Sequence, residues 1–334
     1  MKFPGIRSTA DLARVMGLSR WTVSRALNGH RDISPETAAR IRMEAARRGF
    51  SPSLLGRSLR SGRTDLVGVC VPDIEDYFLT AKISLIQRHL AKSGFHALLQ
   101  IAGSSDEEAD AIRRFASMRC CGGMTVASRL EGGRKLAGAA PGIPVVHVDP
   151  LNARAGIVVR TDRGHAMRLA VRHLHSRGCR RLVAAGIDPD AAGYAAERRN
   201  GLQKEIVRWC WDRPAVFLRA AGADDFETGT LAAAELLGLP GRGRTGVIAL
   251  NDRVAFAMMQ ALSAAGARIP GRIAVVGYDD SALARIANPA LTSIDPRPDK
   301  LIQAAAELLL KGLGGYAKAE RVVVKPELVV RASS

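Results

Sequence analysis

The sequence predicts an all-α helix-turn-helix head followed by an α/β core made of two doubly wound parallel-sheet subdomains. The chain has 334 residues, which is more than one hydrophobic core usually organises. The net charge is +17, and residues 1–63 carry thirteen Lys and Arg against four Asp and Glu. From residue 64 onward, short apolar runs alternate with helix-forming stretches, which is typical of parallel sheets covered by helices. A small basic module therefore precedes a larger core.

The composition excludes several protein classes. With 47% hydrophobic and 24% charged residues, the chain resembles neither disordered nor fibrous proteins. The five cysteines are odd in number and scattered without a C-x-x-C pair, which argues against a disulfide framework and against a zinc site. No apolar run is long enough for a membrane span, and the basic start leads into no apolar signal core. We expect a cytoplasmic protein without a metal, a cofactor or a membrane partner.

The head contains three short helices that can be read from their capping residues. Ser8, Ser19 and Ser34 are in N-cap positions, and Asp11 completes a capping box with Ser8. Gly17 is a suitable left-handed cap for the first helix. Only residues 17–19 separate the first and second helices, and this spacing is that of a helix-turn-helix.

In a helix-turn-helix, the second helix enters the major groove of DNA with its N-terminal side chains at the base edges. Arg20, Trp21 and Arg25 project away from the apolar face of this helix, and arginine can bind guanine bidentately. The expected DNA-binding residues of the head are Ser19, Arg20, Trp21, Thr22, Ser24, Arg25 and Asn28. Two alternatives are a solvated basic surface and three helices that pack against a protein partner.

Residues 51–63 predict a short hinge helix between the head (1–50) and the core (64–334). Leu55 and Leu59 lie four residues apart on one face, but two turns are too few for stability alone in water. Such a segment could fold only with DNA and a second copy of the chain present. Leu59 could then insert into the minor groove, beside Arg57. The alternative is a plain linker.

The core pattern predicts about nine strands, which fit two subdomains better than one. The expected strands are residues 66–71, 97–101, 124–127, 145–148, 156–159, 182–185, 216–218, 247–250 and 274–276. The helical stretches include residues 83–92, 166–176, 254–264 and 300–310. In such folds, ligands bind at the carboxyl ends of strands, in the cleft between the halves.

Several segments together resemble the lac repressor (LacI/GalR) family of transcription regulators. They are Ala10-Asp11-Leu12-Ala13, Gly17-Leu18-Ser19, Thr22 to Asn28, Ser58-Leu59-Arg60, Val67 to Asp73, Asn251-Asp252, Gly277 to Asp280, Pro289 to Ile294 and Pro326 to Arg331. The resemblance spans nearly the whole chain in order. It implies a core of periplasmic-binding-protein type, with an N-subdomain of about 64–161 and 293–324 and a C-subdomain of about 162–292 and 325–334.

The resemblance also implies effector-binding residues in the core. Arg198 stands three residues before Gly201, as in the family's R-x-x-G segment, and Arg199 is the competitor if the alignment slips by one. Asn251 and Asp279 follow strands at positions that contact effector in relatives, and Asp162 is a fourth expected residue. Tyr77 and Phe78 could supply a stacking face. Carboxylate, amide and guanidinium groups together suit sugar hydroxyls.

These features predict a sequence-specific DNA-binding regulator that acts as a homodimeric repressor on a near-palindromic operator. A small, sugar-like effector would switch operator binding, by induction or by corepression. The alternatives within this class are an activator and an effector-independent DNA-binding protein. A solute-binding receptor would have no use for residues 1–63. An enzyme is not expected, because no G-x-S-x-G, P-loop or H-E-x-x-H motif is present.

Overall fold

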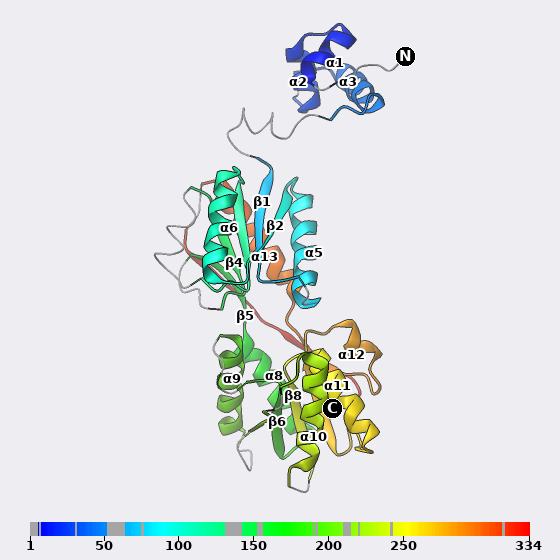
Figure 1. Cartoon of the computed structure of the whole chain (residues 1–334), viewed down its shortest axis with the longest axis vertical. Coiled ribbons are helices and arrows are strands. Elements are labelled where there is room, and N and C mark those ends of the chain that lie inside the picture. The colour runs from blue at the N-terminus through cyan, green and yellow to red at the C-terminus, as the bar shows by residue number, and fades with distance from the viewer. Residues whose placement is uncertain are drawn as a thin grey trace. The chain divides into compact units, whose positions relative to one another are not determined.

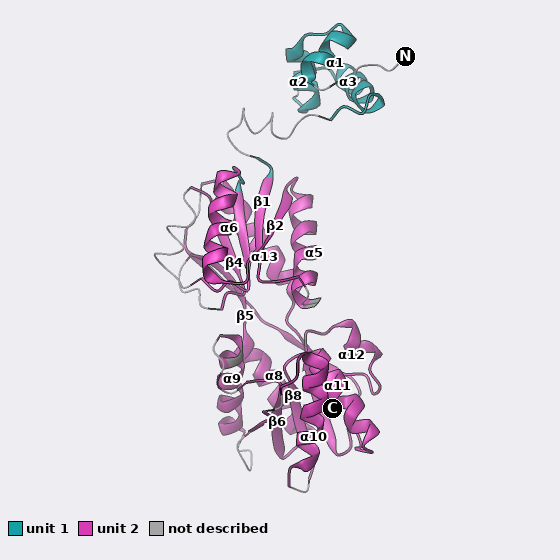
Figure 2. Ribbon diagram, viewed as in Figure 1, with its two compact units in different colours: residues 1–65, 119–121 teal, residues 66–118, 122–334 magenta. Residues whose placement is uncertain are grey.

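A computed structural model describes most of the chain. The described residues are 6, 8–30, 32–51, 64–74, 77–130, 142–151, 156–188, 190, 193–209, 215–219, 221–240, 243–315 and 318–334, without the side chains of Tyr77 and Ala195. They form two compact units, one of residues 1–65 with 119–121 and one of residues 66–118 with 122–334 (Figure 2). None of the helices in these ranges combines the length and apolar character that a membrane crossing needs.

The first unit contains the three predicted head helices, α1 (Thr9–Met16), α2 (Arg20–Leu27) and α3 (Pro35–Arg47) (Figure 1). Each begins where the sequence predicts, because Ser8, Ser19 and Ser34 accept a hydrogen bond from the backbone N–H three residues on. Gly17 ends α1 in the left-handed region, at φ 63°. The core of the unit is small and fully apolar, with Leu12, Val23, Ala26 and Ile41 at its centre.

The second unit contains two six-stranded sheets. The first has the order β11-β5-β4-β3-β1-β2 and is parallel throughout. Its elements are β1 (Leu66–Val71), α5 (Tyr77–Lys92), β2 (His96–Ile101), α6 (Ser105–Ser117), β3 (Gly122–Val126), β4 (Val145–Val148), β5 (Ile157–Thr161), α13 (Pro298–Leu313) and β11 (Glu320–Val324). Helices α5 and α13 pack against each other on one face, and α6 packs on the other (Figure 1). A Cβ at Gly68 would stand 2.1 Å from Cγ of Phe115, so glycine lets α6 lie this close to β1.

The second sheet has the order β12-β10-β9-β8-β6-β7. Its elements are α8 (Arg163–Ser176), β6 (Arg181–Ala185), α9 (Tyr194–Arg208), β7 (Val216–Phe217), α10 (Asp225–Gly238), β8 (Thr245–Ala249), α11 (Asp252–Ala264), β9 (Ile273–Tyr278), α12 (Ala282–Ile286), β10 (Thr292–Asp295) and β12 (Glu327–Val329). Alternate residues of β6 enter different cores: Val183 packs with α10 and α11, whereas Leu182 packs with α8 and α9. This alternation confirms the doubly wound arrangement, in which strands have both faces covered.

Three differences from the sequence prediction concern the strands near the C-terminus. Strands β10, β11 and β12 were not among those expected. β12 pairs antiparallel with β10. Only two residues separate it from β11, so the chain enters the second sheet at the carboxyl ends of its parallel strands and runs in the opposite direction. The predicted subdomain boundary at residue 293 falls inside β10. Since β10 pairs with β9, residues up to Asp295 belong to the second sheet.

Candidate DNA and effector sites

Helix α2 of the head presents its predicted DNA-binding residues in two groups. Arg20 and Trp21 are exposed at the first turn, and Trp21 retains 61% of its accessible surface. An indole this exposed is unusual, since a side chain of this size normally packs against the core. The sequence predicted both residues to point away from Val23, which is fully buried.

The other predicted residues of α2 have partners within the head. The hydroxyls of Ser19 and Thr22 lie 2.8 Å apart, and the Asn28 amide donates to the carbonyl oxygen of Ser24 at 2.6 Å. These contacts fix side chains at both ends of the helix. Arg57 and Leu59 lie outside the described residues.

Arg25 is held against the head by two contacts that the sequence did not predict. Its Nε lies 2.5 Å from Oδ2 of Asp32, and its guanidinium lies 4.9 Å from the ring centre of Trp21. The contact with Arg25 lowers the pKa of the Asp32 carboxyl. Asp32 thus holds the guanidinium of Arg25 through Nε, and contact of Arg25 with a guanine stays a prediction.

A cavity of about 320 Å³ in the core brings together three of the predicted effector residues. Phe78 comes from α5 beside the first sheet, whereas Asn251 and Asp279 follow β8 and β9 of the second sheet. Phe226 of α10 adds a second aromatic ring. The volume lies within the usual range for small-molecule sites, and the lining combines two aromatic rings with an amide, two carboxylates and the guanidinium of Arg253. This arrangement suits a ligand with both apolar faces and hydroxyl groups.

The polar wall of this cavity is fixed by hydrogen bonds. Asn251 caps α11, since its Oδ1 accepts from the backbone N–H of Val254 at 2.9 Å, and its Nδ2 donates to Asp225 at 2.8 Å. Asp252 is buried and accepts from the Ser293 hydroxyl at 2.6 Å, while burial raises its pKa. A Cβ at Gly277 would stand 2.3 Å from Oδ1 of Asp252, so this strand end requires glycine.

Asp279 has a backbone conformation that non-glycine residues rarely adopt. Its φ is 104°, and the next residue, Asp280, has φ 48°. Asp280 accepts from Nη2 of Arg331 at 2.6 Å, which helps hold the turn. Strained backbone concentrates at functional sites, so this conformation is a reason to predict a functional role for the turn after β9 that does not depend on its sequence pattern.

Of two further predicted residues, Arg198 lies next to this cavity and Asp162 lies away from it. Arg198 stacks 3.9 Å from the ring centre of Tyr278 and donates from Nη1 to the carbonyl oxygen of Leu250 at 2.6 Å. It therefore contacts the residues that directly precede Asp279 and Asn251. Asp162 instead caps α8, accepting from the N–H of His165 at 2.8 Å, and lines a different cavity. The Tyr77 side chain lies outside the described residues.

A buried ionic cluster connects the two halves of the core, and the sequence did not predict it. Nζ of Lys82 lies 2.8 Å from Oδ2 of Asp149, and Nη2 of Arg163 lies 3.1 Å from Oδ1. Lys82, Asp149 and Arg163 are each at most 5% exposed. Arg163 also lies over the Tyr194 ring at 3.7 Å and pairs with Glu197. Helices α5 and α8 are thereby joined through a single carboxylate.

The electrostatics of this cluster favour ionised Asp149. Burial alone would raise the pKa of Asp149, but the charges of Lys82 and Arg163 outweigh it. Hydrogen bonds from Lys82 and from the backbone N–H of Thr161 act in the same direction, so the pKa lies well below its usual range. Asp149 directly follows β4, so the same rule that selected Asn251 and Asp279 could have found it. Lys82 lies within a helix and gives no such signal.

The described part of the chain contains no group of three or more His, Cys, Asp or Glu side chains that could hold a metal ion.

Family models match both units. A helix-turn-helix model matches residues 7–42, and a model of a periplasmic binding protein-like domain matches residues 171–334. The chain is 30% identical to the transcriptional regulator reg1 of Streptomyces lividans over 353 aligned positions, which cover 97% of this chain and 96% of that protein. It is 26% identical to the transcriptional repressor PurR of Vibrio atlanticus, with 97% of each chain covered.

Solved structures have the same fold. A lac repressor dimer bound to operator and an anti-inducer has a TM-score of 0.82 at 22% identity, with 97% of each chain covered. A complex of the transcriptional regulator CelR with cellobiose has a TM-score of 0.68 at 25% identity, covering 98% of this chain and 100% of that one. These relatives are transcription regulators, not enzymes.

Proposed function

Because the chain belongs to the LacI/GalR family of DNA-binding transcription regulators, we propose that it is a homodimeric repressor whose operator binding is switched by a small, sugar-like effector. Its place of action is the cytoplasm. Two heads related by a two-fold axis read the two halves of a near-palindromic operator. Arg57 and Leu59 contact the DNA between the half-sites, and Leu59 enters the minor groove.

The observation that carries this proposal is the core cavity that Phe78, Asn251 and Asp279 line together. Its aromatic rings suit the apolar face of a sugar, and its carboxylate and amide suit adjacent hydroxyls. The CelR structure with cellobiose and a related LacI regulator structure with D-xylulofuranose support a sugar as the class of effector. Arg198 completes the polar set through its position against Tyr278 and Leu250.

The cavity also supports a mechanism for switching. Phe78 belongs to the half of the core with the first sheet, whereas Asn251 and Asp279 belong to the other half. A ligand that contacts both halves stabilises the arrangement in which both sets of contacts are made, and so shifts the equilibrium between arrangements. The coupling is reciprocal: an effector that weakens operator binding itself binds less tightly to the protein on DNA.

The test starts with the full-length protein and a panel of neutral mono- and disaccharides. We expect at least one sugar to raise the Tm and to change operator affinity by about tenfold or more, a typical size for allosteric coupling. Fluorescence anisotropy of labelled operator measures the second effect. If no sugar changes either quantity, the regulator is not switched by a sugar.

The residue assignment is tested with Asp279→Asn, which keeps the size of the side chain and tolerates positive φ. The matched control is Asp110→Ala, which removes an exposed carboxylate of α6. Operator affinity without sugar should be unchanged in both variants, whereas the response to sugar should be lost only in Asp279→Asn. Equal responses in the two variants would refute the assignment of Asp279.

A further inference from the structure

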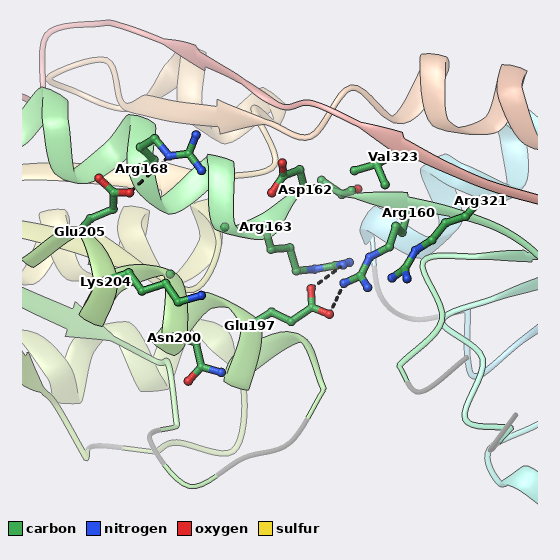
Figure 3. A pocket seen from close by; sticks show the side chains of 13 residues that line it. Arg160, Asp162, Arg163, Arg168, Glu197, Asn200, Lys204, Glu205, Arg321 and Val323 are labelled. Atoms are coloured by element: carbon green, nitrogen blue, oxygen red, sulfur yellow. Dashed lines mark hydrogen bonds and ion pairs between the residues drawn. The ribbon is translucent and has the colours of Figure 1, made fainter. Parts of the chain in front are cut away.

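A second cavity, of about 500 Å³, lies where strands of the first sheet meet helices of the second. Arg160 of β5 and Arg321 of β11 line one side, and Arg168 of α8 and Lys204 of α9 line the other (Figure 3). Arg163 also lines it. The residues after β5 and β11 connect the two halves of the core, so this cavity adjoins those connections. It is distinct from the cavity of Phe78, Asn251 and Asp279, with which it shares no lining residue.

The three carboxylates of this second cavity already have partners. Asp162 caps α8. Glu197 pairs with Arg160 and Arg163, and Glu205 accepts from Arg168 at 3.3 Å and from the Trp209 indole at 3.3 Å. Five cationic side chains thus face three carboxylates. The cavity keeps an excess of two positive charges.

The excess comes from Lys204 and Arg321. Within the described ranges, neither side chain has an ion pair or a hydrogen bond. Both are exposed, and both extend toward the middle of the cavity from opposite halves of the core (Figure 3). In the sheet register, Arg321 pairs with Val158 and Val323 pairs with Arg160, so the two arginines lie on the same face of neighbouring strands.

Arg163 adds donors from the protein interior. The side chain is 5% exposed, and its Nε and Nη1 make no hydrogen bond with any described residue. Its Nη1 is 3.6 Å from the Glu197 carboxylate, which is too long for a hydrogen bond. A buried guanidinium with unused donors is costly, because each unused N–H has lost its contact with water and has gained no hydrogen bond in exchange. Arg163 therefore adds a positive charge at the wall of the cavity, beside Glu197.

We propose that this cavity is a second ligand site, which binds a small metabolite carrying a phosphate group. A phosphate dianion would neutralise the two unpaired charges of Lys204 and Arg321. Its oxygens would accept charge-assisted hydrogen bonds from both, which are stronger than neutral hydrogen bonds. Because Arg321 and Lys204 belong to opposite halves of the core, the bound anion would join the halves beside their connecting segments. The proposal does not depend on the identity of the effector in the first cavity.

The test compares two double variants of the full-length protein that have the same net charge. Lys204→Met with Arg321→Gln removes the unpaired charges of the cavity. Lys300→Met with Arg272→Gln removes two exposed cations elsewhere in the core. The basic head is identical in both, so anion binding there is the same. Isothermal titration calorimetry at constant ionic strength measures the affinity for glycerol 3-phosphate and for inorganic phosphate, with glycerol as the neutral comparison.

We expect wild type and the Lys300→Met, Arg272→Gln variant to bind glycerol 3-phosphate alike, and the Lys204→Met, Arg321→Gln variant to bind about tenfold more weakly or worse. Glycerol should not bind. Equal affinities in the two double variants would overturn the proposal, as would the absence of saturable binding to wild type up to about 10 mM, a concentration well above a millimolar Kd. If no sugar proves to bind in the first cavity, the comparison of glycerol 3-phosphate affinities still tests the second cavity.

Discussion

Replacing Lys82 with methionine is expected to destabilise the core strongly, although Lys82 makes a single ion pair with the residues that the structure describes. Its Nζ lies 2.8 Å from Asp149, and the two side chains are 3% and 2% exposed. The same ammonium lies 4.5 Å from the ring centre of Phe78. Methionine fills a volume close to that of the lysine stem, so the change removes the charge and its contacts while leaving a small cavity.

The magnitude follows from what remains around Asp149. Removing one partner of a buried ion pair usually costs about 3–5 kcal/mol, because a charge is left buried without full compensation. Asp149 would keep Arg163 at 3.1 Å and the Thr161 backbone N–H at 2.8 Å. We therefore expect a loss near the lower end, about 3 kcal/mol in the free energy of unfolding.

The chain contains a matched control in Lys311, whose Nζ lies 3.0 Å from Glu320 with side chains 57% and 42% exposed. An exposed pair contributes at most about 1 kcal/mol, so Lys311→Met should be nearly neutral. Urea denaturation followed by circular dichroism measures both losses. If the two variants lost the same free energy of unfolding, the buried Lys82–Asp149 pair would stabilise the core no more than an exposed pair does, which would refute the reasoning.

Three other predictions concern the head, the hinge and pH. Asp32→Asn should tighten binding to any duplex about threefold at low salt, because Arg25 loses its carboxylate partner and the basic head gains one unit of net positive charge. Unchanged affinity in anisotropy titrations would contradict this. Leu59→Ala should weaken operator binding far more than binding to random DNA, since a wedge acts only at the true site, and an equal loss on both would refute the hinge assignment. Burial lowers the pKa of His147 from 6.5 to about 4. Between these values the unfolded chain binds a proton that the folded chain does not, so stability should fall as the pH drops from 6.5 to about 4, by up to about 3 kcal/mol. His147→Asn should remove that part of the pH dependence, and identical pH profiles for the variant and wild type would contradict it.

The local features of this fold could be predicted from the sequence. Ser8, Ser19 and Ser34 set the helix starts of the head, because an N-cap acts on a backbone N–H only three residues away. The apolar strands of both sheets were also predictable, since strands covered on both faces are continuous apolar runs. Strand β11 was missed because it is an edge strand whose burial alternates, and charged residues flank its valines.

The contacts between distant residues could not be predicted in this way. Lys82 and Asp149 are 67 positions apart, and nothing near Lys82 distinguishes it from an exposed helical lysine. Asn251 and Asp279 could be selected because they follow strands, and the structure brings them to one cavity. The same rule also selected Asp162, whose carboxylate caps α8, because a cap and a ligand-binding carboxylate occupy the same place after a strand.

The central claim is that this chain reads a specific operator as a two-fold symmetric dimer. It is tested most directly by selecting random duplex DNA with the full-length protein at fixed, near-physiological salt, with and without a pool of sugars, and sequencing the bound fraction. Salt is held constant because contacts to phosphates dominate nonspecific affinity. The account predicts enrichment of a near-palindromic motif in one of the two conditions. Bound DNA without sequence preference in both conditions would contradict it.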